Sequence, residues 1–174
     1  MAGHSHWKQI KQQKGRADAA RGALFSKLLA AISIAAKTEP NPDFNPRLRS
    51  AIEKAKENKV PLENIERAIK KASEEKDLAE FTIEAYGPEG IAIIIEGITD
   101  NTNRTTSEIR HLLDSNEAKM ANPGSVLWGF EKAEGGWKAK FPQAITSEGK
   151  QKLEDLVKIL EDHNDVQKVI TNAQ

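Results

Sequence analysis

The first twenty-seven residues carry cations and an aromatic ring at spacings suited to binding a polyanion. Six basic residues face one acid, Asp18, and Trp7 and two histidines lie among them. Cations attract phosphate and release counterions as they neutralise it, and an indole stacks on an exposed base with about 1–3 kcal/mol. The segment predicts a nucleic-acid-binding arm with the candidate contacts Trp7, Lys8, Lys11, Lys14, Arg16, Arg21 and Lys27. The alternative is a solubilising tail whose indole folds back as a hydrophobic anchor.

A second set of basic residues lies on the segments that follow. Arg47 and Lys54 are seven residues apart and so share one helical face. Arg67, Lys70 and Lys71 stand at i, i+3 and i+4 and also share a face. Both groups extend the predicted phosphate-binding surface. The alternative is a solvated face of weak ion pairs, with the acidic partners Glu53, Glu57, Glu63 and Glu66.

The string "TDNTNRT" places amides and a guanidinium between an expected strand and an expected helix. Asn101, Asn103 and Arg104 beside a helix N-terminus are suited to holding an anion or a base edge. A capping loop, in which Asp100 and Asn101 bond local backbone, explains the same residues. Both interpretations stay open.

The other motifs give weaker indications of function. His4 and His6 have no third ligand nearby, so no metal site is predicted. The chain has no phosphate-binding loop, nucleophile elbow, dinucleotide fingerprint or zinc-protease motif, so we expect neither an enzyme nor a cofactor. In "SVLWGFE", Val126, Trp128 and Phe130 share a strand face, faintly like the base-stacking strand of an RNA-recognition domain. Its signature is absent, and core packing is expected instead.

The elements that position the first two groups read as three helices. Residues 17–37 show an apolar stripe at helical spacing through Leu24, Leu28 and Ile32. Residues 1–15 lack the stripe, which predicts a mobile arm or a loosely ordered first helical turn. Asn45 before Pro46 is typical of a helix start, and a third helix is expected to begin at Pro61. Together they predict a small helical bundle.

The second half changes to strand periodicity. Strands are expected at residues 81–86, 91–98, 125–131, 137–141 and 166–171, with helices from Thr105 and around residues 153–160. Without the first strand the order is β-α-β-β-α-β, which predicts a ferredoxin-like sheet backed by two helices on one face. The first strand extends this sheet. The fold class is therefore α+β: a three-helix bundle followed by the ferredoxin-like domain.

Charge divides the 174 residues in the same place. Residues 1–71 hold 15 Lys and Arg against 7 Asp and Glu, and residues 72–174 hold 11 against 19. We therefore expect a basic helical domain over 1–76 and an acidic domain over 77–174, joined by the polar linker "SEEKDLAE". With no cysteine and with no apolar run longer than the five residues of "IAIII", we expect a cytoplasmic protein without a membrane span.

Four motifs in order resemble the YebC/PmpR family: "MAGHSHW", "NIERAIKKA", "TDNTNRT" and "GSVLWGFE". The ending "DVQKVITNA" is similar as well. The resemblance implies a DNA-binding transcriptional regulator, although a mitochondrial branch activates translation and some bacterial members act on the ribosome. His6 stands where the family usually has lysine. Only eighteen residues separate "GSVLWGFE" from the last helix, where the family usually inserts a third domain, so the chain resembles a short form.

The residues and the resemblance together predict a nucleic-acid-binding regulator of gene expression, foremost a DNA-binding transcriptional regulator. One alternative is a ribosome-associated translation factor that binds ribosomal RNA. Another is a protein–protein adaptor without nucleic acid, whose basic half docks an acidic partner. A ribosomal or regulatory protein partner fits the acidic half. The oligomeric state does not follow from the sequence.

Overall fold

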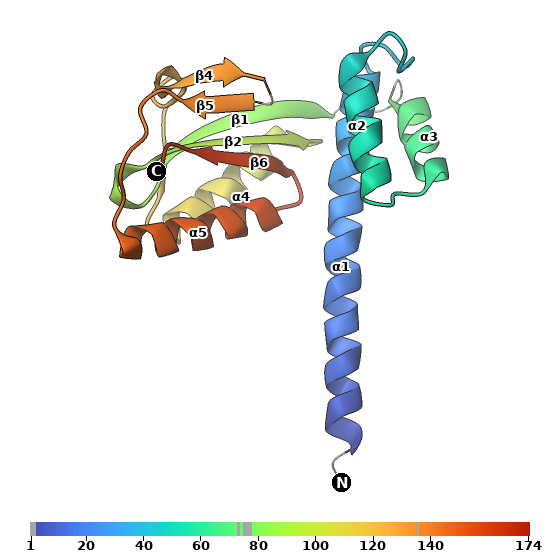
Figure 1. The fold of residues 1–174 in the computed structure, drawn as a ribbon, viewed down its shortest axis with the longest axis horizontal. Coiled ribbons are helices and arrows are strands. Elements are labelled where there is room, and N and C mark those ends of the chain that lie inside the picture. Colours follow the sequence, from blue (N-terminus) through green and yellow to red (C-terminus); the bar gives the residue numbers. More distant parts are fainter. Residues whose placement is uncertain (1–2, 73, 75–77, 135) are drawn as a thin grey trace. The chain divides into compact units, whose positions relative to one another are not determined.

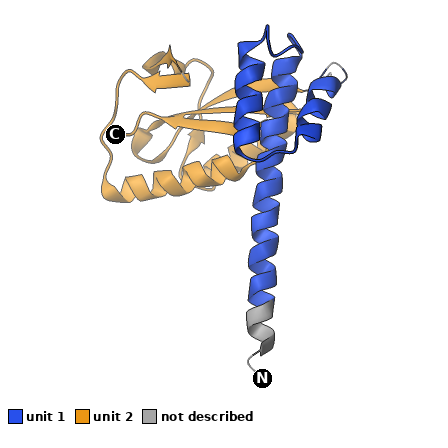
Figure 2. Cartoon of the chain, turned by 45° about the vertical axis from the view of Figure 1, so that its right-hand side comes forward, with its two compact units in different colours: residues 1–76 blue, residues 77–174 orange. Residues whose placement is uncertain are grey.

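The computed structural model describes residues 3–72, 74, 78–134 and 136–174, and side chains from Lys8 onward. The chain divides into two compact units, Met1–Lys76 (unit 1) and Asp77–Gln174 (unit 2), which we describe separately (Figure 2). Residues 73 and 75–77 of the expected linker lie outside the described residues, and its last two residues, Ala79 and Glu80, already belong to the first strand.

Unit 1 contains three helices, as the apolar spacing predicted: α1 (Gly3–Ala36), α2 (Pro46–Glu57) and α3 (Leu62–Lys71) (Figure 1). They pack because each contributes one apolar face to a shared core. The buried side chains of that core include Leu28, Ile32, Leu48, Ala55, Ile65 and Ala68. The core involves the last third of α1, so α2 and α3 cover only that end of the helix.

The turn between α1 and α2 is fixed by Asn45. Its side-chain oxygen accepts a hydrogen bond from the backbone N–H of Leu48 at 3.0 Å and caps α2. Its amide nitrogen donates to the carbonyl oxygens of Ala35 and Glu39 at 2.9 and 2.8 Å. One buried side chain thus ends α1 and begins α2, which confirms the helix start predicted at Asn45–Pro46.

The predicted mobile arm is wrong for residues 3–15, because α1 is one continuous helix from Gly3. The missing apolar stripe showed only that this part of the helix has nothing to pack against. Lysine, glutamine and arginine are good helix formers, and extending an existing helix is far easier than nucleating one. The packed end of α1 supplies that nucleus.

The sheet of unit 2 has the strand order β3-β1-β2-β6, and all neighbours are antiparallel. The strands are β1 (Ala79–Tyr86), β2 (Ala92–Thr99), β3 (Lys119–Met120) and β6 (Val166–Thr171). Helices α4 (Thr102–Asp114) and α5 (Ser147–Asp162) cover one face, as Figure 1 shows. The α+β class, with three helices before a sheet domain, is confirmed.

The strand order differs from the predicted ferredoxin-like arrangement. The first strand was expected to extend the sheet, yet β1 lies inside it between β2 and β3. Within the part of the chain that the structure describes, the strands β4 (Phe130–Ala133) and β5 (Gly136–Ala139) pair only with each other, as a separate two-stranded sheet. The tight turn Pro88–Gly90 (η1) explains the position of β1, because it folds β1 back to pair with β2 along eight residues. The edge of β2 that β1 occupies is then not open to β4 or β5.

The strand predicted over residues 125–131 begins only at Phe130, and Leu127–Gly129 form a 3-10 turn, η2. The cause is Glu84 on β1. Its buried carboxylate accepts the backbone N–H groups of Gly124, Val126 and Leu127 at 2.5, 2.6 and 2.8 Å. Because these donors converge on one side chain, the segment curls around Glu84 rather than extending along the sheet.

The stretch Lys8–Ala36 of α1 is, by length and composition, apolar enough to cross a membrane, which the sequence reading did not predict. Its uninterrupted apolar runs are short, but the alanines, leucines and isoleucines around Arg21 and Lys27 together raise its mean hydropathy. Core helices of globular proteins meet the same criterion, and Leu28 and Ile32 of this stretch pack in the helical core.

Candidate nucleic-acid interface

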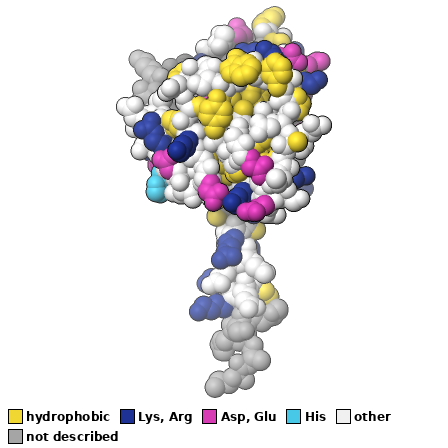
Figure 3. All heavy atoms as spheres, turned by 90° about the vertical axis from the view of Figure 1, so that its left-hand side faces the viewer, with side chains coloured by type: hydrophobic (Ala, Val, Ile, Leu, Met, Phe, Trp, Pro, Cys, Tyr) yellow, Lys and Arg dark blue, Asp and Glu magenta, His cyan; other side chains and the backbone are white. Residues whose placement is uncertain are grey.

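The first candidate surface is the part of α1 that extends beyond α2 and α3, residues 8–22, which we call the basic segment. Every residue of it is exposed, and Figure 3 shows basic side chains along this helix. It carries five cations and Asp18. Among the described residues, Lys8, Lys11, Lys14 and Arg16 form no ion pair. The segment therefore presents positive charge that no carboxylate of the described chain neutralises.

The helix decides how these charges are spaced. Lys8, Lys11 and Lys14 follow one another at i, i+3 and i+6 and so lie along one side of α1. Arg16 lies on another side of the helix. Arg21 is the first to contact a neighbour, since its guanidinium lies 5.2 Å from the ring centroid of Phe25. The predicted arm is thus the exposed, basic part of a continuous helix.

Two residues of the predicted arm differ from this description. Lys27 is half-buried near the helical core and has a further polar partner. The side chain of Trp7, like those of His4 and His6, lies outside the described side chains. The choice between a stacking indole and a hydrophobic anchor therefore stays a prediction.

The basic residues of α2 and α3 are more mixed. Arg67 is held by Glu63, with 2.6 Å between Nη2 and Oε1, as the ion-pair alternative expected. Lys54, Lys70 and Lys71 are exposed, whereas Arg47 interacts with another group of the protein. Exposed pairs such as Arg67–Glu63 contribute little to stability. Helices α2 and α3 therefore present basic and acidic side chains together, in contrast to the mainly basic segment of α1.

The "TDNTNRT" loop is built differently, around Arg104 of α4. Its Nη2 atom lies 2.8 Å from Asp165 Oδ2 and 3.0 Å from Asp100 Oδ1, and its Nε lies 3.9 Å from Glu108 Oε2. We call these four residues the Arg104 cluster. Three carboxylates surround one guanidinium, so the local charge opposes the approach of a phosphate.

The rest of the loop acts as a cap. Asn101 accepts the backbone N–H of Arg104 at 3.1 Å, so α4 begins at Thr102 and not at Thr105 as predicted. Thr105 is instead buried and donates to Asp165 at 2.5 Å. Asn103 is exposed on the first turn. These contacts favour the capping interpretation of the loop.

Asp165 is the residue that the sequence analysis missed, since it lies 61 residues from Arg104. Burial alone would raise the pKa of Asp165, but hydrogen bonds from Thr105, Arg104 and Thr99 outweigh it and hold that pKa below its ordinary value. The same bond raises the pKa of Arg104. No local signal in "HNDV" identifies this partner, because only the fold brings β6 beside the start of α4.

Glu108, His163 and Asp165 bring three possible ligand atoms within 4.8 Å of one another. Two of them are already engaged, because His163 Nε2 lies 2.9 Å from Glu108 and Arg104 donates to Asp165 at 2.8 Å. The guanidinium occupies the place where a cation would lie. This group is therefore better described as part of the Arg104 cluster than as a metal site.

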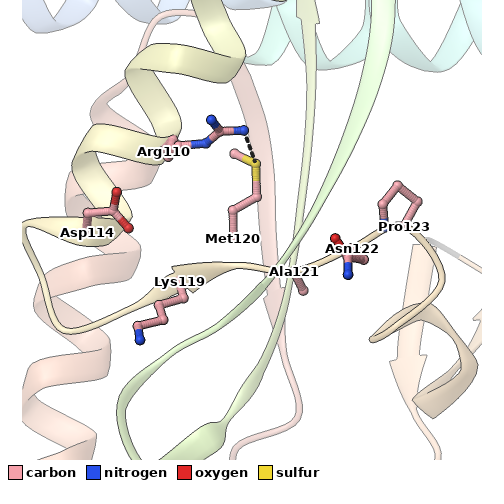
Figure 4. Close-up of a pocket in the computed structure, with 7 residues that line it drawn as sticks. All are labelled: Arg110, Asp114, Lys119, Met120, Ala121, Asn122 and Pro123. Atoms are coloured by element: carbon pink, nitrogen blue, oxygen red, sulfur yellow. Dashed lines mark hydrogen bonds between the residues drawn. The ribbon is translucent and has the colours of Figure 1, made fainter.

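A hollow of about 410 Å³ lies between α4 and the short strand β3 (Figure 4). Arg110 and Met120 point toward each other across it, with 3.7 Å between Nη2 and Sδ. Asp114 and Lys119 give its rim both signs of charge. None of the described side chains that were predicted to bind nucleic acid lines this hollow.

The fold and the sites define a class: an α+β protein that joins a basic helical unit to an acidic sheet unit. Residues 5–75 match the family described as "TACO1/YebC protein N-terminal domain", and residues 78–134 match "TACO1/YebC second and third domain". The chain belongs to the TACO1/YebC family. This confirms the resemblance stated from the motifs.

Relatives and a solved structure agree with this assignment. A "Probable transcriptional regulatory protein" of Aquifex aeolicus is 50% identical over 136 residues, 76% of this chain and 55% of the relative. The "Probable transcriptional regulatory protein DET0444" of Dehalococcoides mccartyi is 50% identical over 135 residues, 75% and 54% respectively. The chain spans about half the length of the curated relatives it matches.

The structural match reaches further along the chain. The crystal structure of the conserved hypothetical protein Aq1575 from Aquifex aeolicus superposes with a TM-score of 0.83 at 32% identity, covering 90% of this chain and 91% of that one. The family match ends at residue 134, inside the β4–β5 hairpin. Beyond this point the fold is similar over a longer stretch than the sequence.

Proposed function

We propose that this protein is a DNA-binding regulator of gene expression that holds duplex DNA with the basic segment of α1. The observation that carries the proposal is the set of five exposed cations on residues 8–22, none of which forms an ion pair among the described residues. Its relatives are named as probable transcriptional regulatory proteins rather than as enzymes. We place this activity in the cytoplasm.

The shape of the segment favours DNA. An α-helix with its side chains is about 10–12 Å wide, and the major groove of B-form DNA is about 12 Å wide. The major groove of an RNA duplex is too narrow for side chains to read. Fifteen helical residues extend about 22 Å, so cations along this length contact several phosphates.

Salt dependence tests the proposal. Each phosphate contact contributes about 0.9 to the slope of log affinity against log salt. In the variant K8A/K11A/K14A we expect weaker binding to a 20-base-pair DNA duplex, with a slope flatter by about 2.7. Fluorescence anisotropy between 50 and 200 mM salt measures both. The matched control, K119A/K150A/K158A, removes three exposed lysines of unit 2 and should bind as the unaltered protein does.

The alternatives give different results in the same experiments. Equal slopes for the unaltered protein and K8A/K11A/K14A would contradict the role of the basic segment. Weak DNA binding together with cosedimentation on ribosomes, lost in K8A/K11A/K14A, would replace DNA by ribosomal RNA as the target. Absence of binding to DNA, RNA and ribosomes at low salt would leave the adaptor interpretation.

A further inference from the structure

We propose that unit 2 carries a second nucleic-acid contact, an aromatic groove that stacks an unpaired base of a single strand. The groove has a volume of about 530 Å³ and is lined by residues that include Tyr86, Ser125, Trp128, Phe141 and Asn172. Figure 3 shows hydrophobic side chains gathered on this face of unit 2. Neither the family names nor the proposed role of α1 assigns it a function.

Two rings form the centre of the groove. Trp128 and Phe141 have their ring centroids 5.7 Å apart and their planes at 45°. Their exposed fractions are 66% and 59%, far above those of Val126 at 1% and Phe130 at 2%. The sequence predicted core packing for all three residues of "SVLWGFE". The structure confirms it for Val126 and Phe130 and contradicts it for Trp128.

The polar edges of the aromatic side chains are already used. Trp128 Nε1 donates to the carbonyl oxygen of Ser125 at 2.8 Å, and Tyr86 Oη donates to the same oxygen at 3.0 Å. The indole therefore offers its face rather than its N–H group, which is the mode in which aromatic side chains bind bases of any sequence. Glu84 holds the loop that carries Trp128, so the ring is positioned before a ligand arrives.

The charges around the groove also suit a nucleotide. Residues 77–174 hold 17 Asp and Glu against 10 Lys and Arg, yet no charged side chain lines the groove. At its rim, Lys140 Nζ donates to the carbonyl oxygen of Trp128 at 3.1 Å. An ammonium group has three donors, so two remain for a phosphate. One short single strand could therefore stack a base on the Trp128 indole and place a phosphate at Lys140.

Protein partners also use exposed tryptophan, but the neutral lining and the lysine at the rim favour a nucleotide. The inference rests on the proposed function for its ligand class, but it uses a different surface. A base must be unpaired to stack on a side chain, so the two contacts differ in the strand they bind: duplex at the basic segment, single strand at the groove.

The test uses the full chain and two probes, a twelve-residue oligothymidylate and a DNA duplex, measured by fluorescence anisotropy. Removing a stacked base contact costs about 1–3 kcal/mol, so Trp128→Ala should weaken oligothymidylate binding about 5- to 150-fold. Its duplex affinity should be unchanged. Trp128→Phe keeps an aromatic face and should retain most of the binding. Phe44→Ala, an exposed ring of unit 1, is the matched control.

The outcomes separate the two proposals. If Trp128→Ala and Trp128→Phe both bind oligothymidylate as the unaltered protein does, the groove proposal is overturned while the basic segment is unaffected. If K8A/K11A/K14A binds duplex normally but Trp128→Ala loses the single strand, the α1 proposal fails and the groove stands. If the NMR signal of the Trp128 indole N–H shifts on addition of a Leu-Lys peptide but not of oligothymidylate, the groove is a protein-docking surface and the proposal is wrong.

Discussion

The basic segment of α1 and the Arg104 cluster of unit 2 use the same chemistry in opposite ways. Lys8, Lys11 and Lys14 lie in solvent with no ion pair among the described residues, whereas Arg104 is held by three carboxylates. The sequence nominated both as nucleic-acid contacts because it shows residue types alone. The difference shows that the pairing of a cation, and not its presence, decides whether it is available to a polyanion.

The largest expected effect comes from opening the cluster. Asp165→Ala removes the acceptor of Arg104, Thr99 and Thr105, and unpaired buried donors are costly. We expect the free energy of unfolding of unit 2 to fall by about 3 kcal/mol, measured by urea denaturation. Asp162→Ala, an exposed acid at the end of α5, should change it by less than about 0.5 kcal/mol.

The same variant sharpens the comparison between the two regions. At urea concentrations below the denaturation midpoint, Asp165→Ala removes one of the three carboxylates that hold Arg104 and leaves Asp100 and Glu108 in place. The basic segment is unchanged. Duplex affinity should therefore stay within about twofold of the unaltered protein. A strong rise in affinity would show that the cluster, once opened, is a latent phosphate site.

The second-largest expected effect comes from Glu84, a buried carboxylate of unit 2. Burial alone would raise the pKa of Glu84, but bonds from the backbone N–H groups of Gly124, Leu127 and Val126 hold it below the ordinary value. A carboxyl group whose pKa is lower in the folded state stabilises the fold above its unfolded pKa. That stability is lost as the pH falls through the folded pKa.

We therefore expect the free energy of unfolding of unit 2 to decrease below about pH 4.3, with Asp165 adding to the decrease. Glu84→Gln should cost about 2 kcal/mol at neutral pH and reduce the acid dependence, measured by urea denaturation from pH 3 to 7. Glu131→Gln, an exposed acid on β4, is the control. An acid dependence that is identical in Glu84→Gln and the unaltered protein would refute this account.

The smallest effect tests whether the basic segment is free of tertiary contacts. A Cβ atom added at Gly15 or Gly22 meets nothing within 4 Å. Alanine there should stabilise the helix by about 0.5–1 kcal/mol per site, seen as greater helicity by circular dichroism. At Gly97 an added Cβ would collide with the carbonyl of Asp165 and the ring of Phe81, so Gly97→Ala should destabilise. Loss of helicity in Gly15→Ala would indicate a hidden packing partner.

Much of the fold followed from local patterns. The apolar stripe through Leu28 and Ile32, the Asn45–Pro46 cap and the strand "VQKVIT" each specify an element within a few residues, and each is confirmed. The strand order did not follow, because the place of β1 depends on which edges remain open once other strands have paired. The alternation in "SVLWGFE" predicted a strand that would bury Trp128. The segment instead curls around Glu84, a residue 44 positions before Trp128, and the ring stays exposed.

The sequence by itself determined the helices, most strands, the family and the split between a basic and an acidic half, because these depend on spacing and composition along the chain. Tertiary structure decided which charges and rings face solvent. Asp165 reaches Arg104 and Glu84 curls the Trp128 loop through bonds between residues far apart in sequence. Such partners are chosen by the packing of the sheet, so only the folded chain distinguishes a free cation from a paired one.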